Sequence, residues 1–215
     1  MNMEIEHILP HEIEKRSFEI ITEELTEMGI TLPADRDFVI KRAIHTTADF
    51  DYAHTLVFSE NAVKIMAELI RSGAIIVTDT NMGLAGINKK ELASYGGSAR
   101  CFMADEDVAA EAKQRGVTRA TVSMERAAGL DRPIIFAVGN APTALIQLRA
   151  MRDEGRYTPA FVIGVPVGFV NVVAAKEMII ETDIPHIVNR GRKGGSNVAA
   201  AICNAVLYEM KKGNL

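Results

Sequence analysis

Apolar runs of strand length, most of them followed by a polar turn and a helical pattern, limit what this chain of 215 residues can fold into. A strand that is buried on both faces reads as a nearly continuous apolar run, and such strands belong to parallel sheets that helices cover on both sides. The runs lie at 56–58, 74–78, 99–103, 134–138, 160–165 and 185–188. We therefore predict one α/β domain over residues 1–215, built on a mainly parallel sheet.

Apolar residues at helical spacing predict the helices that connect these strands. The predicted helices cover 10–28, 33–45, 59–73, 105–115, 118–128, 139–154 and 172–180, and a last helix begins at 196. Ser59, Asn140 and Ser196 are residue types that cap helices and stand at three of these starts, and Pro142 fits a first turn. Residues 79–86 are predicted as a glycine-containing turn.

The charge balance excludes several classes of partner. The formal net charge is −4 and the sequence pI is about 5.8, whereas nucleic acids and anionic membranes require a broad basic surface. Cys101 and Cys203 fall in a predicted strand and a predicted helix without metal-ligand spacing, so we expect buried free thiols and a reducing compartment. The acidic start has no apolar signal core and no run is long enough to span a bilayer, which predicts a cytoplasmic protein.

Polar, glycine-containing turns follow four of the predicted strands, at 78–83, 139–143, 166–168 and 190–196. In an open parallel sheet such turns line the crevice at the carboxyl edge, where ligands bind. Each turn by itself is better explained as an ordinary connection or cap. The four together favour a binding site.

The turn 190–196 carries Arg190, Arg192 and Lys193 among three glycines, directly before the predicted helix that starts at Ser196. Backbone N–H groups and cationic side chains would converge there on an anion. Guanidinium groups bind carboxylates through paired planar donors, and they would hold phosphate equally well. A solvated run of charges without a ligand is the alternative that the loop alone leaves open.

His45 follows Arg42 by three residues, so the two side chains lie on neighbouring parts of one helix face. An imidazole at a helix end beside a cation could give or take a proton near neutral pH. A histidine with a purely structural role is the alternative. The other histidines show no metal-ligand spacing, and no metal site is predicted. Known nucleotide-binding and nucleophile motifs are missing as well.

Four segments carry a more specific pattern, and they are Ile44–Thr47, Gly139–Leu145, Gly164–Val170 and Arg190–Ser196. Together they resemble the precorrin-8X methylmutase family of cobalamin biosynthesis, also called cobalt-precorrin-8 methylmutases. The similarity extends from Arg16 to the last helix. It implies a three-layer α/β/α fold, a homodimer, and an isomerase that moves a methyl group from C-11 to C-12 of a tetrapyrrole. The implied substrate is precorrin-8x or cobalt-precorrin-8, and the product is hydrogenobyrinate or cobyrinate.

The resemblance also implies roles for individual residues. His45 would handle a proton at the ring, Ser17 and Arg42 would contact the substrate, and Arg119 is similarly placed. An intramolecular methyl shift needs neither a redox cofactor nor a covalent nucleophile, so no cofactor is expected. Scattered arginines suit a ring that is fringed with carboxylates. The predicted substrate-binding residues are Arg16, Ser17, Arg42, Arg119, Asn140, Thr143, Gly168, Arg190, Arg192 and Ser196.

Asn171-Val172-Val173 departs from the pattern, because the family more usually has small residues such as Gly-Ala there. Neutral drift at a helix start explains the departure, and it leaves the preferred substrate open. A second class of function is also compatible with the residues. It is a non-catalytic, flavodoxin-like module that binds a phosphorylated ligand at 190–196 and has no preference for tetrapyrroles.

Overall fold

A six-stranded sheet forms the centre of the computed structural model, which describes residues 6–215. The strands are β1 (Leu56–Phe58), β2 (Ile75–Thr78), β3 (Ser98–Arg100), β4 (Ile134–Val138), β5 (Phe161–Gly164) and β6 (His186–Asn189). Their order in the sheet is β1-β6-β5-β4-β2-β3. All neighbouring pairs are parallel except β1 with β6. The predicted mainly parallel sheet is therefore confirmed.

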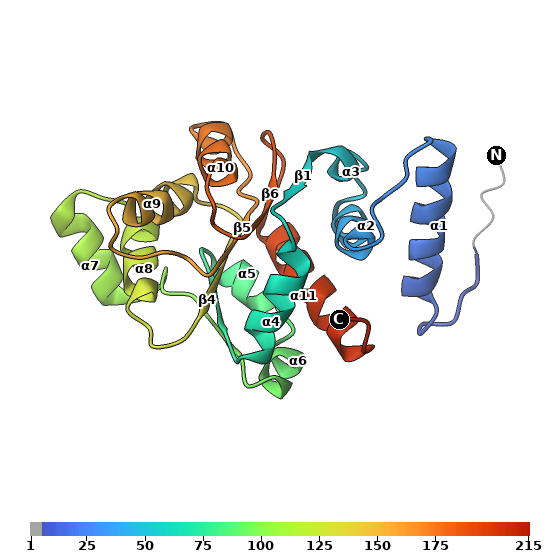
Figure 1. The fold of residues 1–215 in the computed structure, drawn as a ribbon, viewed down its shortest axis with the longest axis horizontal. Helices are drawn as coiled ribbons and strands as arrows, with labels where there is room; N and C mark the ends of the chain where they lie inside the picture. Colours follow the sequence, from blue (N-terminus) through green and yellow to red (C-terminus); the bar gives the residue numbers. More distant parts are fainter. Residues whose placement is uncertain (1–5) are drawn as a thin grey trace.

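Helices cover both faces of this sheet and complete a three-layer α/β/α fold. Figure 1 shows α7 to α10 on one side, α2, α4, α5 and α11 on the other, and α1 outermost beyond α2. The helices are α1 (Ile13–Glu27), α2 (Asp37–Thr47), α3 (Tyr52–Thr55), α4 (Ala62–Arg71), α5 (Asn81–Gly86), α6 (Lys89–Ser94), α7 (Glu106–Arg115), α8 (Arg119–Ala128), α9 (Pro142–Asp153), α10 (Val172–Ile180) and α11 (Ser196–Lys211).

Alternate residues of the central strands face two separate cores. In β4, Ile135 and Ala137 pack with α2, α4 and α11, whereas Ile134 and Phe136 pack with α7 to α10. Every residue of β4 is buried, because both sheet faces are covered. The apolar run at 134–138 is thus explained by burial on two sides, as expected for a parallel sheet.

Several predicted boundaries were wrong for identifiable reasons. The third predicted strand ends at Arg100, because β2 pairs with it only through Ile75–Val77, and Cys101 lies half-buried beyond it. Cys203 is buried in α11 as predicted, and both thiols are free. The first two helices begin later than predicted, at Ile13 and Asp37, because hydrogen-bonded turns precede them.

The predicted turn at 79–86 is a helix, and α6 was missed entirely. Thr80 caps α5 by accepting a hydrogen bond from the Gly83 N–H, and Asn88 caps α6 in the same way. The last glycine of α5 serves packing, since a Cβ on Gly86 would lie 2.8 Å from the Cβ of Ala200 in α11. Ser59 does not cap α4, because its Oγ accepts a bond from the His186 N–H instead.

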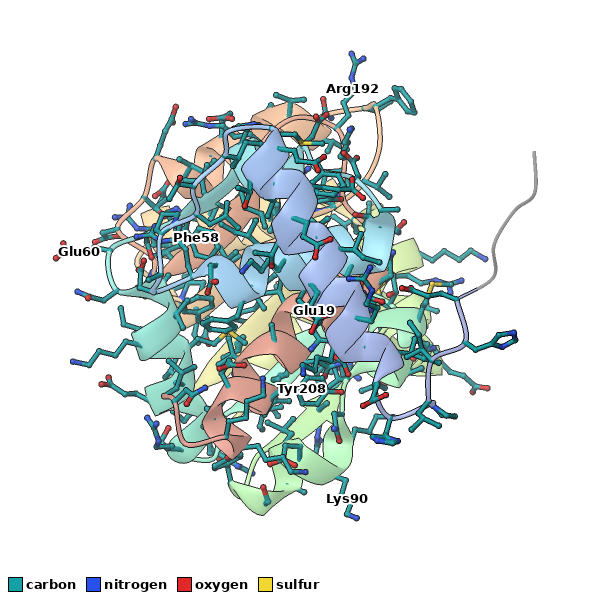
Figure 2. The ribbon with its side chains drawn as sticks, turned by 90° about the vertical axis from the view of Figure 1, so that its right-hand side faces the viewer. Glu19, Phe58, Glu60, Lys90, Arg192 and Tyr208 are labelled. Carbon is teal, nitrogen blue, oxygen red and sulfur yellow. The ribbon has the colours of Figure 1, made fainter. Side chains whose placement is uncertain are left out.

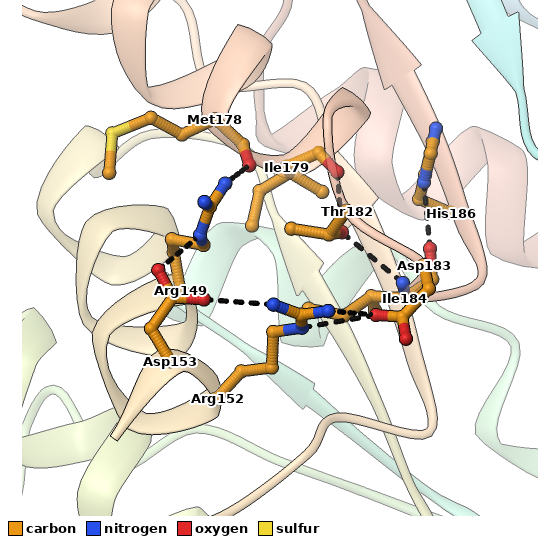
Figure 3. A network of polar contacts seen from close by, with 9 residues as sticks. All are labelled: Arg149, Arg152, Asp153, Met178, Ile179, Thr182, Asp183, Ile184 and His186. Carbon is orange, nitrogen blue, oxygen red and sulfur yellow. Dashed lines mark hydrogen bonds and ion pairs between the residues drawn. The ribbon is translucent and has the colours of Figure 1, made fainter. Parts of the chain in front are cut away.

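A polar network fixes α10 against α9 at the end of the molecule where β6 begins (Figure 3). Arg149 of α9 donates to the Met178 carbonyl at 2.6 Å, and Arg152 pairs with Asp183 at 2.6 Å. Partly exposed ion pairs contribute little stability one by one. Their connection through Asp153 nevertheless fixes the position of α10, which carries a buried lysine described below.

Candidate functional site

The ends of β2, β4, β5 and β6 meet at one edge of the sheet because these strands are parallel. The segments that follow them, 79–83, 139–143, 165–171 and 189–196, are called the carboxyl-edge loops here. The third and fourth of these segments bond to each other through their backbones. The Gly168 N–H donates to the Arg192 carbonyl at 3.2 Å, and the Gly195 N–H donates to the Val165 carbonyl at 2.9 Å. The predicted convergence of these turns at the carboxyl edge of the sheet is confirmed.

Asp79 connects two of these loops and was missed by the sequence analysis. Its carboxylate is buried and accepts the N–H groups of Gly139, Asn140 and Ala141 at 2.8, 2.8 and 2.5 Å. Burial raises the pKa of Asp79, and the three N–H bonds act in the opposite direction. Asn140 was predicted to cap α9, but the cap position is Ala141 and no side chain caps this helix. The carboxylate of Asp79 instead binds the N–H groups that precede the helix.

The N-terminus of α11 packs directly against the β4 loop. A Cβ on Gly139 would lie 2.6 Å from the Cα of Ser196, so only glycine allows this approach. Ser196 is the first helical residue and not the cap as predicted, since the cap position is Gly195. Its hydroxyl bonds to the Thr80 hydroxyl at 2.7 Å and so ties α11 to the loop after β2.

The cations of the 190–196 loop differ in their partners. Lys193 pairs with Asp49 and Asp51 at 2.6 Å, and Arg190 pairs with Glu177 at 3.2 Å. Arg192 lies over the ring of Phe169 at 5.4 Å and pairs with no carboxylate among residues 6–215. Figure 2 shows Arg192 projecting at one end of the face that α1 crosses. Of the three predicted anion-binding cations, Arg192 is the one placed to accept a new carboxylate without losing an ion pair.

Lys176 and Asn189 support this loop from below, and neither was predicted. The Lys176 Nζ donates to the carbonyls of Gly191 and Lys193, both at 2.8 Å, and burial lowers the pKa of Lys176 to about 8. The Asn189 Nδ2 also donates to the Lys193 carbonyl, at 2.8 Å. A lysine within the apolar face of a predicted helix was the available signal for Lys176.

Thr143, at the start of α9, lies beside the start of α8. The Thr118 hydroxyl caps α8 by accepting the Thr121 N–H, and it donates to the Thr143 Oγ1 at 3.0 Å. Arg119 is exposed at this N-terminus and pairs with no carboxylate in the described part of the chain. The structure thus brings Thr143 and Arg119 to neighbouring helix starts.

His45 lies in the last turn of α2 and is exposed. Its ring stacks on Phe18 of α1, with centroids 5.4 Å apart, and the Arg42 guanidinium lies over the same Phe18 ring at 4.7 Å. Arg42 also pairs with Glu14 and lies over the Tyr208 ring at 5.2 Å. The predicted proximity of His45 and Arg42 is confirmed.

Arg16 and Ser17 belong to the same region through α1. Arg16 approaches Glu6, Glu19 and Glu23 at 3.4 to 3.6 Å, and the Ser17 hydroxyl donates to the Ile13 carbonyl at 2.9 Å. The residues Arg16, Ser17, Phe18, Arg42 and His45 are called the α1–α2 face here. A groove of about 630 Å³ beside this face is lined by Phe18, Arg42 and Tyr208, among others, and by none of the carboxyl-edge loops.

Comparisons with known proteins identify the kind of protein that carries these two regions. The family profile described as precorrin-8X methylmutase matches residues 12–209. The chain belongs to this family. A cobalt-precorrin-8 methylmutase of Salmonella typhimurium is 43% identical, over 94% of this chain and 97% of that protein. A precorrin-8X methylmutase of Pseudomonas aeruginosa is 35% identical, over 92% and 94%. The solved precorrin-8x methyl mutase of Thermus thermophilus has a TM-score of 0.85 and 36% identity, over 95% of this chain and all of that one.

Three of the four segments that resemble the precorrin-8X methylmutase family lie in the carboxyl-edge loops, and the fourth ends α2 at Thr47. Lys193 links the two regions through Asp49 and Asp51, which follow α2 directly. The phosphate-binding, non-catalytic alternative finds no support among these relatives. Within residues 6–215, no cluster of three metal-ligand side chains occurs, and no helix is long and apolar enough to cross a membrane.

The departure from the precorrin-8X methylmutase pattern at Asn171 has a conformational explanation. Asn171 precedes α10 in the left-handed region, with φ of +60°. Glycine adopts this conformation readily, and asparagine is one of the few other residues that tolerates it. Asn171 therefore tolerates the backbone conformation found at this helix start, and its side chain is exposed.

Proposed function

We propose that the protein is a methylmutase of corrin biosynthesis, an isomerase that moves a methyl group from C-11 to C-12 of precorrin-8x or cobalt-precorrin-8. The products are hydrogenobyrinate and cobyrinate. The observation that carries the proposal is the family match over residues 12–209, which includes His45 and all four carboxyl-edge loops. Cobalt enters this reaction inside the substrate ring and is not a ligand of the protein.

His45 gives or takes the proton that changes the electronic state of the ring. The exposed imidazole is accessible to a large substrate, while stacking on Phe18 restricts its orientation. General acid or base catalysis of this kind contributes a factor of about 100 to 10,000. Arg42 sits beside it on the same aromatic ring and binds a carboxylate of the substrate, taking the place that Glu14 occupies in the free protein.

The carboxyl-edge loops bind the acidic rim of the ring. Arg192 is available for a carboxylate, and Arg119 adds a second exposed guanidinium at the start of α8. Thr143, Gly168 and the helix start at Ser196 line the same edge. Because paired planar donors match carboxylates, these groups fix the position of the ring while the methyl group shifts within it.

We further propose that the protein acts in the cytoplasm as a homodimer. The dimer is supported by apolar side chains that lie on the surface along α1 and at its C-cap, namely Ile13 at 52%, Ile20 at 37% and Met28 at 53% exposure. Both free thiols suit a reducing compartment. Light scattering should give a mass of about twice the 23.4 kDa chain, and a monomer at assay concentrations would refute the dimer.

The test of the activity is turnover by purified protein without added cofactor. Metal-free precorrin-8x and its cobalt form should be offered in parallel, and the change in visible absorbance should be recorded together with product analysis. Conversion of either form supports the proposal, and the ratio of the two kcat/KM values identifies the preferred substrate. Binding of a nucleotide or sugar phosphate, without conversion of either tetrapyrrole, would contradict it.

A further inference from the structure

Lys176 is a fully buried lysine that forms no ion pair with any of residues 6–215. Its side chain is 0% exposed, and among residues 6–215 its Nζ contacts only the carbonyl oxygens of Gly191 and Lys193. A buried ammonium without a carboxylate partner destabilises the folded state, because hydration is lost and no opposite charge replaces it. An apolar side chain of the same length could fill the space without that cost. The charge therefore calls for an explanation beyond packing.

The position of Lys176 determines how the 190–195 loop presents its backbone. Two loop carbonyls point inward to the ammonium, and Asn189 donates to the carbonyls of Arg190 and Lys193 at 3.2 and 2.8 Å. In the described part of the chain, the N–H groups of residues 191–194 donate to no acceptor. Carbonyls held on the inner side, with unpaired N–H groups, make a loop suited to anions.

We infer that Lys176 is a positioning residue for anion binding, which holds the carbonyls of the 190–195 loop away from a substrate carboxylate and lends its uncompensated charge from beneath. This inference rests on the proposed function for the identity of the anion. From the sequence, the affinity of this loop for an anion was expected to come from Arg190, Arg192 and Lys193 alone. The inference adds Lys176, a buried residue of α10, as a further contributor. Two of those cations are already neutralised by Glu177, Asp49 and Asp51, so a third source of positive charge matters.

Two substitutions separate the hydrogen bonds from the charge. Lys176→Met keeps the length of the side chain and removes both properties, whereas Lys176→Gln keeps an amide donor without the charge. Both variants should bind the corrin product about tenfold more weakly, while kcat at saturating substrate stays within about threefold of the wild type. If Lys176 had only a structural role, the two substitutions would lower the stability of the protein and the amount of active enzyme. The dissociation constant of the folded fraction would then stay unchanged.

Amide hydrogen exchange tests the positioning role without any ligand. The Gly168 and Gly195 N–H groups, which bond across the loop, should exchange faster in Lys176→Met than in the wild type. The Ala175 N–H, which donates to the carbonyl of the cap residue Asn171, serves as the internal control. Equal protection of Gly168 and Gly195 in both proteins would overturn the positioning role, whatever the enzyme's substrate.

The wild-type protein provides a test that needs no variant. Above about pH 8 Lys176 loses its charge but keeps two donors for the two carbonyls, so product binding should weaken while the loop amides stay protected. Arginine and carboxylate charges do not change in this range, the pKa of Lys193 is raised, and that of His186 is lowered, so none of them mimics the effect. The charged or titratable groups on the elements packed against α10 are Arg149, Arg152 and Asp153 of α9 and His186 of β6. Glu177 of α10 itself and Arg190, Arg192 and Lys193 of the adjoining loop complete the set.

The outcomes distinguish this inference from the proposed function. Failure of the wild type to convert or bind either tetrapyrrole refutes the proposed function, and the exchange experiment still decides the role of Lys176 in the loop. Normal turnover, with equal product affinity in the wild type, Lys176→Met and Lys176→Gln, refutes the inference alone. Loss of affinity in Lys176→Met but not in Lys176→Gln would limit the role to hydrogen bonding and overturn the part assigned to the charge.

Discussion

The carboxyl-edge loops and the α1–α2 face are built from different interactions. The loops are joined by backbone hydrogen bonds and by buried polar groups, with Asp79 and Lys176 each serving several backbone partners. The α1–α2 face is held by stacking and cation–π contacts around Phe18, and the carboxylates of its ion pairs, such as that of Glu14, are exposed. The first region therefore has the fixed backbone partners that the proposed binding of the ring requires. The second has the exposed side chains that the proposed proton transfer requires.

If the α1–α2 face supplies the chemistry and the carboxyl-edge loops supply the binding, His45→Ala should have the largest effect on catalysis. We expect kcat to fall about a thousandfold, because the proton donor or acceptor is lost, while the dissociation constant of the product stays within about threefold. Single-turnover absorbance measurements and product titration provide these two values. His54→Ala removes another exposed histidine, outside the proposed site, and is the matched control. Unchanged kcat in His45→Ala would exclude the proposed role.

Asp79→Asn should show how much the carboxyl-edge loops depend on one buried carboxylate. An amide offers one oxygen and two hydrogens where two oxygens now accept three N–H groups, so at least one donor loses its partner. We expect a loss of about 3 kcal/mol in the free energy of unfolding, measured in urea. Asp131→Asn, at an exposed aspartate, should change it little. A loss as small as that of the control would mean that the loops are held by other contacts.

The charge of Lys176 should make stability depend on pH in a defined direction. The pKa is lowered from 10.5 to about 8 by burial, so between these values the unfolded chain holds a proton that the folded protein has released. Stability rises with pH wherever the unfolded state binds more protons, and the cost of burying the charge is relieved. Relative to Lys176→Met, the wild type should gain about 2 kcal/mol between about pH 7 and pH 10. A constant difference across this range would show that Lys176 is not a buried cation.

Much of this arrangement could be predicted from the sequence, because some elements are determined by residues that lie next to one another in the chain. The run at 134–138 is apolar throughout, since both faces of β4 are covered, and glycine-containing turns follow it as in other parallel sheets. The motifs around His45 and at 190–196 also pointed to the two regions of the candidate site. The motifs did not indicate which residues, distant in the sequence, would pair with the side chains of these two regions.

Asp79 and the loop cations illustrate that limit. The N–H groups that Asp79 binds lie 60 to 62 residues further along, and nothing local marks it as different from an ordinary turn aspartate. Lys193 was predicted as an anion-binding residue, yet Asp49 and Asp51 approach it from the end of α2. Such pairings arise from the packing of distant elements, so residue type and spacing alone cannot distinguish a free cation from a paired one.

The two arginines of the 190–196 loop should differ slightly in their contribution to product binding, because only one of them is already paired within the described part of the chain. Arg192 has no carboxylate partner among residues 6–215, so Arg192→Ala should weaken product binding about tenfold through the loss of a charge-assisted hydrogen bond. Arg190 must first give up Glu177, so Arg190→Ala should cost less than Arg192→Ala in the same titration. Glu177→Gln should in turn strengthen binding slightly, by freeing Arg190. If Arg190→Ala is the more damaging change, the substrate displaces Glu177 in the complex, and the free loop is rearranged on binding.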